Sequence, residues 1–490
     1  MRPGSGLALR VMHLAVGRRW LPAATAAILA WGTVLRCIAL SYGPLHPDEC
    51  LYATWALAIG KHRDLWLRSV ALDKPPLYPY LLALWAQVGG YGPTSLRLLG
   101  LAFSLLGLAL LAKLAVKRFG PAASVLCLTL AALSPAAVAL DGSALTDPAA
   151  VSMSVAASAA AGSGLPLAAG LLLGLSVATK PQLLAYLPLV ALAGGRPNRE
   201  RTVRVLLGFA AVMLSLVAWE AIRRPEQSFL ALAFAHYGGL HPASWQLAGR
   251  WAGLLSWVWG RASMGLALAA VCLFAAVLAW RRGSPIADND WLAVGAGLSL
   301  LLYIGVSMGL GMPAWDRYAL PAVPLCALLA TWALSRLSSL LPWAWFRQVF
   351  VAMVALGLAA AMAGPAQEAA QHRLPLADTS RWQGIETIAA YVRGQVPGRA
   401  TLLYQDFGWE IHYYLEDFPQ DMRWFEDDAA LLREVGRGSP CYLLLPADDT
   451  GRAQVAMVRG AGYDLHPCVV GYGHNGQPTM ALWLVERTSG

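Results

Sequence analysis

The chain has 490 residues, of which 57% are hydrophobic and only 13% are charged, and its mean hydropathy is +0.51. Soluble domains rarely exceed half apolar residues, so this composition indicates an integral membrane protein. Residues 1–364 hold 27 Lys and Arg against 12 Asp and Glu, whereas residues 365–490 carry a net negative charge. The basic residues therefore belong to loops that flank a membrane, and they form no basic, aromatic-rich face that would indicate a nucleic-acid partner.

An uncleaved membrane anchor is expected first. Residues 1–19 are basic, and the apolar run from Leu21 to Tyr42 lacks a small-residue cleavage site, which predicts a signal-anchor with a cytoplasmic N-terminus. Further apolar runs predict a total of about eleven spans, an odd number that places the two ends of the chain on opposite sides. These runs lie at 96–116, 121–140, 144–162, 164–179, 181–194, 205–222, 262–280, 291–311, 318–335 and 348–364.

Charge placement supports this alternation. The basic clusters at span ends all fall in loops that alternation places in the cytoplasm, as the positive-inside rule requires: Lys113, Lys117 and Arg118; Arg196, Arg199, Arg201 and Arg204; Arg281 and Arg282; Arg336 and Arg347. Nine acids lie outside or at outer span ends: Asp48, Glu49, Asp64, Asp73, Asp141, Asp147, Glu220, Glu226 and Asp316. The chemistry is therefore expected on the outer face.

Two outer segments and a polar tail complete the organisation. Residues 43–95 carry aromatic, amphipathic stretches typical of helices in the membrane interface, and residues 223–261 form a second outer loop. We expect residues 1–364 to form the membrane domain. Hydropathy falls after Pro365, and short apolar segments at 401–404, 442–445 and 480–485 alternate with helix-compatible stretches. Residues 366–490 are therefore predicted to form a small exported α/β domain.

The seven cysteines show no metal-like spacing. Four of them lie within apolar runs, where cysteine usually acts as a small core residue. Cys441 and Cys468 border predicted strands of the exported tail, and they could form a disulfide there.

Charge concentrates at two points of the first outer loop. His46-Pro47-Asp48-Glu49 directly follows the first span, and Asp73-Lys74-Pro75-Pro76 precedes the second. Carboxylates are costly to desolvate, so acids at a membrane boundary favour a functional role. The alternative is a solvated loop with incidental charges.

The order of these and later motifs resembles a known family. The Asp-Glu pair, Lys74-Pro75-Pro76-Leu77 and Arg97 at the start of the second span are followed by Thr146-Asp147-Pro148, the segment 174–180 and the segment 316–324. The series resembles the GT-C glycosyltransferases that use polyprenyl-phosphate-linked sugars, such as protein O-mannosyltransferases and lipid A aminoarabinose transferases. The resemblance covers residues 20–340 and implies an α-helical polytopic fold of about 11–13 transmembrane helices with a small α/β periplasmic C-terminal domain.

The resemblance also implies roles for individual residues. An inverting displacement needs a base for the acceptor hydroxyl and cations for the departing lipid phosphate. Asp48 matches the family's catalytic Asp, and Glu49 is its partner in the pair. Lys74 matches a phosphate-contacting Lys, while Arg317 and Lys180 are further candidates for the donor phosphate. Candidates for supporting or acceptor-side roles are Asp73, Asp147 and His241.

Each assignment has a structural alternative. Glu49 could pair with a nearby Lys or Arg, and Asp147 could cap a helix. Lys180 could extend to the membrane interface, Arg317 could anchor that interface, and His241 could be a solvated loop histidine. No spacing requires a metal or another cofactor, although Asp48 and Glu49 could share a divalent cation with water.

The sequence therefore predicts a multi-pass enzyme of the bacterial cytoplasmic membrane, with an extracytoplasmic C-terminal domain. Its expected partners are a polyprenyl-phosphate-sugar donor and a lipid, glycan or protein acceptor. A secondary transporter is a rival function, but transporters place charges near the bilayer midplane and often contain internal repeats. A non-catalytic lipid-binding subunit is a third interpretation, favoured if Asp48 is dispensable.

Overall fold

The computed structural model describes residues 5–40, 43–236, 244–282, 286–372, 380–437 and 440–488. By its internal contacts the chain divides into two compact units. The helical unit comprises residues 1–42, 64–85 and 94–377. The mixed unit comprises residues 43–63, 86–93 and 378–490, so two pieces of the first large loop belong with the C-terminal segment.

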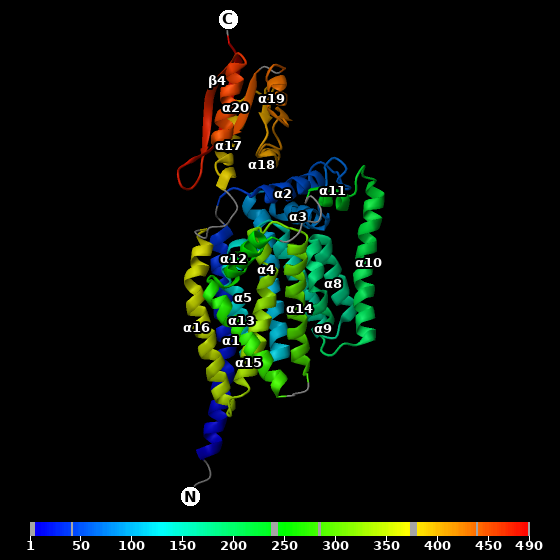
Figure 1. Cartoon of the computed structure of the whole chain (residues 1–490), viewed down its shortest axis with the longest axis vertical. Helices are drawn as coiled ribbons and strands as arrows, with labels where there is room; N and C mark the ends of the chain where they lie inside the picture. Colours follow the sequence, from blue (N-terminus) through cyan, green and yellow to red (C-terminus); the bar gives the residue numbers. More distant parts are fainter. Residues whose placement is uncertain are drawn as a thin grey trace. The chain divides into compact units, whose positions relative to one another are not determined.

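Seven helices in the described part of the helical unit are long and apolar enough to cross a membrane. The chain is therefore a multi-pass membrane protein. These helices run alongside one another in Figure 1. They are residues 21–40 of α1 (Ser5–Leu40), α4 (Pro93–Phe119), α10 (Arg199–Arg223), α13 (Ala262–Arg281), α14 (Asp288–Gly309), η2 with α15 (Asp316–Ala319 and Ala322–Ser338) and α16 (Ala344–Ala370).

The other four predicted spans fall on helices that are too short to be counted among these seven. Proline stands at the first or second position of α5, α6, α8 and η1, where its missing N–H is harmless, but it cannot continue a preceding helix. The apolar runs are thus divided into α5 (Pro121–Ala132), α6 (Pro135–Leu140), α7 (Thr146–Gly162), α8 (Pro166–Thr179), η1 (Pro181–Tyr186) and α9 (Leu187–Leu192). The predicted loops contain α2 (Pro47–Gly60), α3 (Leu77–Gly89), α11 (Phe229–His236) and α12 (Trp245–Trp259). The predicted helical membrane fold is confirmed.

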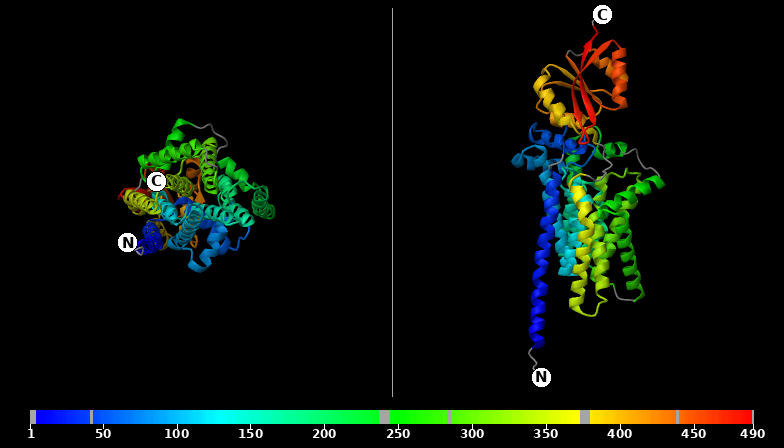
Figure 2. Two further views of the ribbon diagram at one scale, coloured as in Figure 1. Left: turned by 90° about the horizontal axis from the view of Figure 1, so that it is seen from below. Right: turned by 90° about the vertical axis from the view of Figure 1, so that its left-hand side faces the viewer.

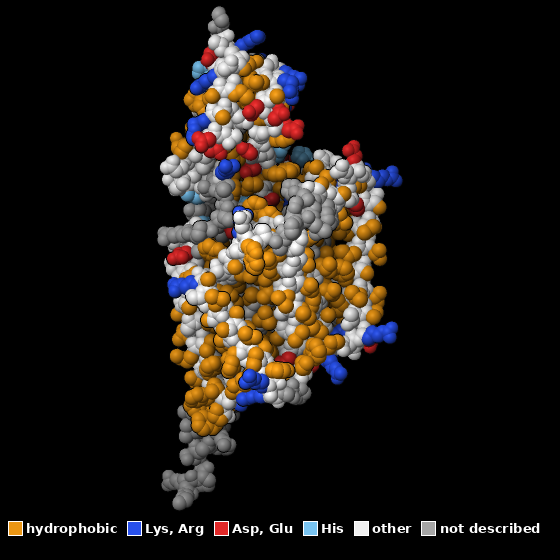
Figure 3. All heavy atoms as spheres, in the orientation of Figure 1, with side chains coloured by type: hydrophobic (Ala, Val, Ile, Leu, Met, Phe, Trp, Pro, Cys, Tyr) orange, Lys and Arg blue, Asp and Glu red, His pale blue; other side chains and the backbone are white. Residues whose placement is uncertain are grey.

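Basic residues gather at one end of the helical unit. Arg118 at the end of α4 donates a hydrogen bond to the carbonyl of Ala193, which ends α9. The Arg196 N–H contacts Asp288 at the start of α14, and Arg336 near the end of α15 pairs with Asp290. The loops predicted to be cytoplasmic therefore meet at this basic end. Figure 3 shows the apolar side chains covering the flank of the bundle, with Lys and Arg below them.

The mixed unit is built on a five-stranded sheet with the order β2-β1-β3-β5-β4. Strands β1 to β3 are parallel, and β5 runs antiparallel between β3 and β4. Figure 2 shows helices on both faces of this sheet, and the predicted α/β fold of the C-terminal segment is confirmed. Its elements are η3 (Ser380–Trp382), α17 (Ile385–Gln395), β1 (Thr401–Tyr404), α18 (Gly408–Tyr414), β2 (Asp421–Trp424), α19 (Asp428–Val435), β3 (Cys441–Pro446), α20 (Asp449–Gly460), β4 (Tyr463–Tyr472) and β5 (Pro478–Arg487).

The structure has no disulfide between Cys441 and Cys468, the pairing that the sequence left open. Both residues are free thiols, on β3 and β4 respectively. Strand β5 lies between β3 and β4. Because neighbouring strands are about 4.7–4.9 Å apart, β3 and β4 are about 9–10 Å apart. A disulfide requires Cα atoms closer than about 7 Å, so the two cysteines cannot pair within this sheet.

Helix α2 is part of the mixed unit because it packs against α18. The Tyr414 hydroxyl accepts a hydrogen bond from the Leu45 N–H at 2.9 Å, just before α2 begins. The Tyr413 hydroxyl donates to the carbonyl of Tyr91 at 2.6 Å. The beginning and the end of the first loop are thus held by consecutive tyrosines of the C-terminal segment.

Candidate functional site

The predicted acidic pair stands at the beginning of α2. His46 Nδ1 accepts a hydrogen bond from the Asp48 N–H at 3.0 Å, and Glu49 Oε2 accepts one from the His46 N–H at 2.8 Å. This reciprocal arrangement is a capping box, which satisfies backbone donors that the first helical turn leaves without intrahelical partners. Glu49 is buried and helps to start α2, while Asp48 is half-buried beside it.

A third carboxyl group, Glu410 of α18, lies near Asp48. Burial raises the pKa of Glu410 to about 7, and the negative charges of Asp406 and Asp48 add to this rise. The Glu410 backbone N–H and the charge of His46 oppose it. A carboxyl group that exchanges a proton near neutral pH is thus part of the surroundings of Asp48, and nothing in the segment 408–414 distinguishes it in the sequence.

The acids around Asp48 do not form a complete metal site. Among the residues that the structure describes, no group of three or more His, Cys, Asp or Glu side chains could hold a metal ion. A divalent cation at Asp48 and Glu49 would therefore take most of its oxygen ligands from water or from a substrate.

Asp73 and Lys74 pair with each other in the helical unit. Lys74 Nζ lies 3.1 Å from Asp73 Oδ2, and both side chains are about one-fifth exposed. The preceding chain is fixed by Arg223, at the end of α10, which donates to the carbonyls of Leu67 (3.1 Å) and Val70 (3.0 Å). Lys74 is therefore an accessible cation on an anchored segment, and two prolines follow it.

Asp147 and Lys180 form a buried ion pair. Lys180 Nζ lies 2.5 Å from Asp147 Oδ1, and the same Nζ lies 4.4 Å from the centre of the Tyr318 ring. Leu145, rather than Asp147, is the N-cap of α7. Because Lys180 is only 6% exposed, it does not extend to the membrane interface. The structural alternatives for Asp147 and Lys180 are thus wrong, and this pair joins α7 to the end of α8.

Aromatic residues bring Arg317 to the same cluster. The Arg317 guanidinium lies 5.5 Å from the centre of the Trp315 ring and 5.7 Å from that of Tyr318. Tyr318 stacks on Trp251 and accepts a hydrogen bond at its carbonyl from the Tyr303 hydroxyl (2.9 Å). Tyr303 lies near the end of α14, and α14 begins at the basic end. Since a helix of this length spans about 30 Å, the cluster lies toward the opposite end of the bundle.

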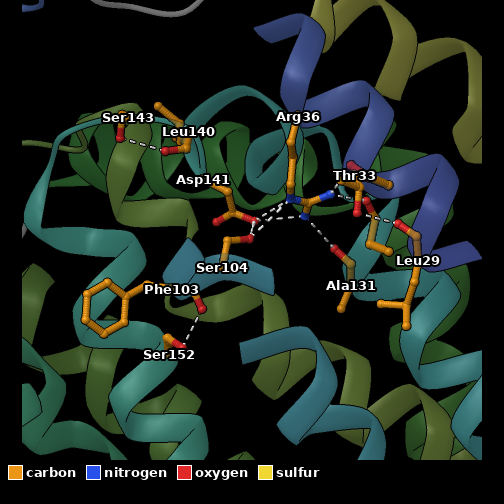
Figure 4. A network of polar contacts seen from close by, with 12 residues as sticks. Leu29, Thr33, Arg36, Phe103, Ser104, Ala131, Leu140, Asp141, Ser143 and Ser152 are labelled. Carbon is orange, nitrogen blue, oxygen red and sulfur yellow. Dashed lines mark hydrogen bonds and ion pairs between the residues drawn. The ribbon is translucent and has the colours of Figure 1, made fainter. Parts of the chain in front are cut away.

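Sequence reasoning missed a further buried network (Figure 4). Arg36 of α1 is fully buried, and its Nε donates to Asp141 (2.9 Å) and Ser104 (3.2 Å). Its Nη1 donates to the carbonyls of Gly32 and Ala132. An unpaired charge is costly within a membrane, so these contacts hold α1, α4, α5 and the end of α6 together. The signal for this network in the sequence was Arg36, a charged residue inside the first apolar run.

The predicted site residues belong to both units. Asp147, Lys180 and Arg317 form one cluster in the helical unit, Asp73 and Lys74 pair in the anchored loop, and Asp48 and Glu49 lie in the mixed unit. His241 lies outside the described residues.

Neither a protein-family model nor a curated protein matches the sequence. Solved structures do match the fold. ArnT from Cupriavidus metallidurans, solved bound to undecaprenyl phosphate, is similar with a TM-score of 0.68 and 15% identity, over 95% of this chain and 98% of that one. The chain has the GT-C fold. The Archaeoglobus fulgidus oligosaccharyltransferase matches this GT-C chain with a TM-score of 0.54 and 12% identity, over 94% of this chain and 74% of that one. The mycobacterial arabinofuranosyltransferase AftD matches with a TM-score of 0.51 and 17% identity, over 95% of this chain and 41% of that one.

Proposed function

We propose that this protein transfers a sugar from a polyprenyl-phosphate donor to a lipid, glycan or protein acceptor at the outer face of a bacterial cytoplasmic membrane. The supporting observation is the GT-C fold, matched along nearly the whole length of both chains by ArnT with undecaprenyl phosphate. The order of the sequence motifs from Asp48 to Arg317 also supports this function.

The proposed reaction is a single displacement. The acceptor oxygen attacks the anomeric carbon of the sugar and forms a new glycosidic bond, while the bond between that carbon and the phosphate oxygen breaks. Asp48 takes the proton of the acceptor hydroxyl, and the bonding electron pair leaves with the polyprenyl phosphate. Attack from the face opposite the leaving group inverts the anomeric configuration.

Cations of the helical unit would bind the phosphate. Negative charge grows on this group as it leaves, so a cation placed there in advance stabilises the transition state. Lys74 is the main candidate because it is accessible and its loop is anchored. Its contact with Asp73 would be exchanged for one with the phosphate. Arg317 offers a planar guanidinium that can bind two phosphate oxygens together.

Lys180 has a different part in this proposal. Asp147 neutralises the charge of Lys180, so Lys180 Nζ would have to be shared between Asp147 and a phosphate oxygen. The ring of Tyr318 fixes the position of the ammonium group from another side. Lys180 is thus held in place before any donor arrives, which lowers the cost of ordering it on binding.

The test uses the purified full chain in lipid vesicles, with undecaprenyl-phosphate-linked sugars and an envelope extract as the acceptor source. We expect release of undecaprenyl phosphate and a matching mass increase of one sugar on an extract component. A non-catalytic lipid-binding subunit would bind the donor without releasing undecaprenyl phosphate. A transporter would carry a solute across the vesicle membrane with no new glycosidic bond, and either result would refute the proposal.

A further inference from the structure

The mixed unit contains a cavity that the proposed chemistry does not use. Its volume is about 560 Å³, and it is lined by Pro47 at the start of α2, by η3, by the segment 404–412 and by the end of β2. This volume falls within the range of about 300–1,000 Å³ that is usual for small-molecule sites. Because Pro47 lines the cavity, the cavity lies beside the residue that precedes Asp48.

Three tryptophans line this cavity. Trp382 meets the His46 ring edge-on with ring centres 4.7 Å apart, and Trp409 meets Trp55 of α2 at 6.3 Å. Trp424 is 57% exposed, although large apolar side chains are usually buried in a folded domain. Its Nε1–H donates to the carbonyl of Gln405 at 3.2 Å, which fixes the orientation of the ring. Indole faces that are exposed and held in position offer stacking platforms for a flat, partly apolar ligand.

Hydrogen-bonding groups stand among these rings. Asp406 and Glu410 are among the lining residues, and so are Tyr404 and His412, whose hydroxyl and Nε2 are hydrogen-bonded to each other at 2.8 Å. Burial lowers the pKa of His412, so the imidazole is neutral at neutral pH. Most of these groups accept hydrogen bonds, which suits a ligand with several hydroxyl donors.

The backbone at the cavity is strained. Phe407, which also lines the cavity, has φ +64° and ψ +22°, in the left-handed region. A bulky side chain rarely adopts this conformation, which costs about 1 kcal/mol or more and concentrates at ligand-binding and active sites. The strain is an independent indication that this wall is shaped for binding.

The local charge narrows the class of ligand. Asp406 and Glu410 are both acidic, and Asp48 lies close to Glu410. Arg381, a cation of the lining, is 3.3 Å from Asp448 and is partly neutralised by it. An anionic ligand would meet net repulsion here, whereas a neutral polyol would not.

We propose that this cavity binds a neutral sugar unit of the acceptor, stacked on Trp424 and hydrogen-bonded to Asp406 and Glu410. This role rests on the proposed function, since it names the acceptor as a saccharide or a glycosylated molecule. Bound there, the sugar would tether the acceptor close to Asp48 and raise the local concentration of its hydroxyl group.

Binding is measured first, without donor and without transfer. The purified full chain is titrated at pH 8 with the methyl glycosides of glucose, galactose, mannose and N-acetylglucosamine, and with methyl glucuronide as the anionic match, by saturation-transfer NMR. At least one neutral glycoside should bind, and the glucuronide should bind at least about tenfold more weakly. If no neutral glycoside binds, or if the glucuronide binds equally well, the proposal is refuted.

Variants locate the site. Trp424→Ala should weaken binding about fivefold, because an aromatic contact is removed. Asp406→Asn, a substitution at an exposed position, should also weaken it and guards against a folding defect in the first variant. Tyr472→Ala removes an equally exposed aromatic ring of β4 outside the cavity and should bind as the wild type does. Unchanged binding in both Trp424→Ala and Asp406→Asn would overturn the proposal.

Transfer kinetics then separate this proposal from the proposed function. Trp424→Ala should raise the KM for the acceptor with little change in kcat or in donor binding. A wild-type chain that transfers sugar while Trp424→Ala leaves the acceptor KM unchanged would refute the acceptor site alone. A wild-type chain that binds glycosides through Trp424 but never transfers sugar would refute the proposed function and, with it, the assignment of the bound sugar to an acceptor.

Discussion

Lys180 Nζ lies 2.5 Å from Asp147 Oδ1, and both side chains are buried within the helical unit. Removing one partner of a buried ion pair leaves an uncompensated charge and costs about 3–5 kcal/mol, whereas replacing both partners costs far less. We expect Asp147→Ala to lower the apparent melting temperature of the purified chain strongly and Asp147→Ala/Lys180→Met to restore much of it. Glu200→Ala breaks the exposed pair with Arg204 and should change little. Equal losses in the single and the double variant would contradict the coupling.

Gly100 of α4 faces the turn that carries Asp141. A Cβ atom at Gly100 would lie 2.1 Å from the carbonyl oxygen of Ser143, so the backbones would have to separate. Gly100→Ala should therefore destabilise the chain and loosen the Arg36–Asp141 contact. Gly357→Ala is the matched control, because Gly357 is also helical and a Cβ there meets nothing within 4 Å. Thermal unfolding of both variants tests this packing, and equal melting temperatures would contradict it.

Glu410 should make stability depend on pH. Its pKa is about 7 in the folded chain, against an ordinary value of 4.5, so the folded state holds the proton more tightly than the unfolded state does. Stability should thus fall as the pH rises from about 4.5 to 7 and level off above, by about 3 kcal/mol at most. Glu410→Gln cannot ionise and should be more stable than the wild type at pH 8 but not at pH 4.5. Parallel melting curves of the two proteins across this window would count against a raised pKa.

The basic end of the helical unit predicts the orientation in the membrane. A reporter that works only after export should be active when fused after Gly490. The same reporter inserted after Asn198, in the loop between α9 and α10, should be inactive, because that loop belongs to the basic end. The opposite pair of results would reverse the orientation and place the proposed site in the cytoplasm.

Hydropathy predicted the helices well because each apolar run reports its own partition into lipid, independent of the rest of the chain. Strands β1, β3 and β5 were predicted for a similar reason, because each contains a short apolar run that packs within the sheet. Strand β2 was not predicted, and the bounds of β4 were not predicted either, because Asp421, Arg423 and the polar residues of β4 interrupt the apolar pattern.

Contacts between distant segments could not be read from the sequence. The Leu45 N–H and the Tyr414 hydroxyl are 369 residues apart in the chain, and no local pattern brings them together. The same holds for Glu410, whose unusual pKa comes mainly from burial, with smaller contributions from the nearby Asp406 and from Asp48 of a distant segment. Asp147 and Lys180 could be proposed as site residues from their motifs, but their pairing required the packing of α7 on α8.

Lys74→Ala tests the phosphate contact separately from the chemistry. Loss of this cation should weaken donor binding and also slow transfer, because the same charge stabilises the leaving group. Binding of an undecaprenyl-phosphate-linked sugar is measured by titration of the purified chain, and transfer by release of undecaprenyl phosphate. Donor binding equal to that of the wild type would remove Lys74 from the phosphate site.

Asp48→Asn is the most direct test of the account. The amide keeps the shape of the carboxylate but cannot take the proton of the acceptor, so transfer should fall by about 10²–10⁴-fold. Donor binding should stay close to that of the wild type, because the phosphate and the prenyl chain are held elsewhere. Asp417→Asn, at an 82% exposed side chain of the same unit, controls for the loss of a charge and should transfer normally. Transfer and donor binding are measured on the same purified protein. Transfer by Asp48→Asn near the wild-type rate would contradict the proposed mechanism.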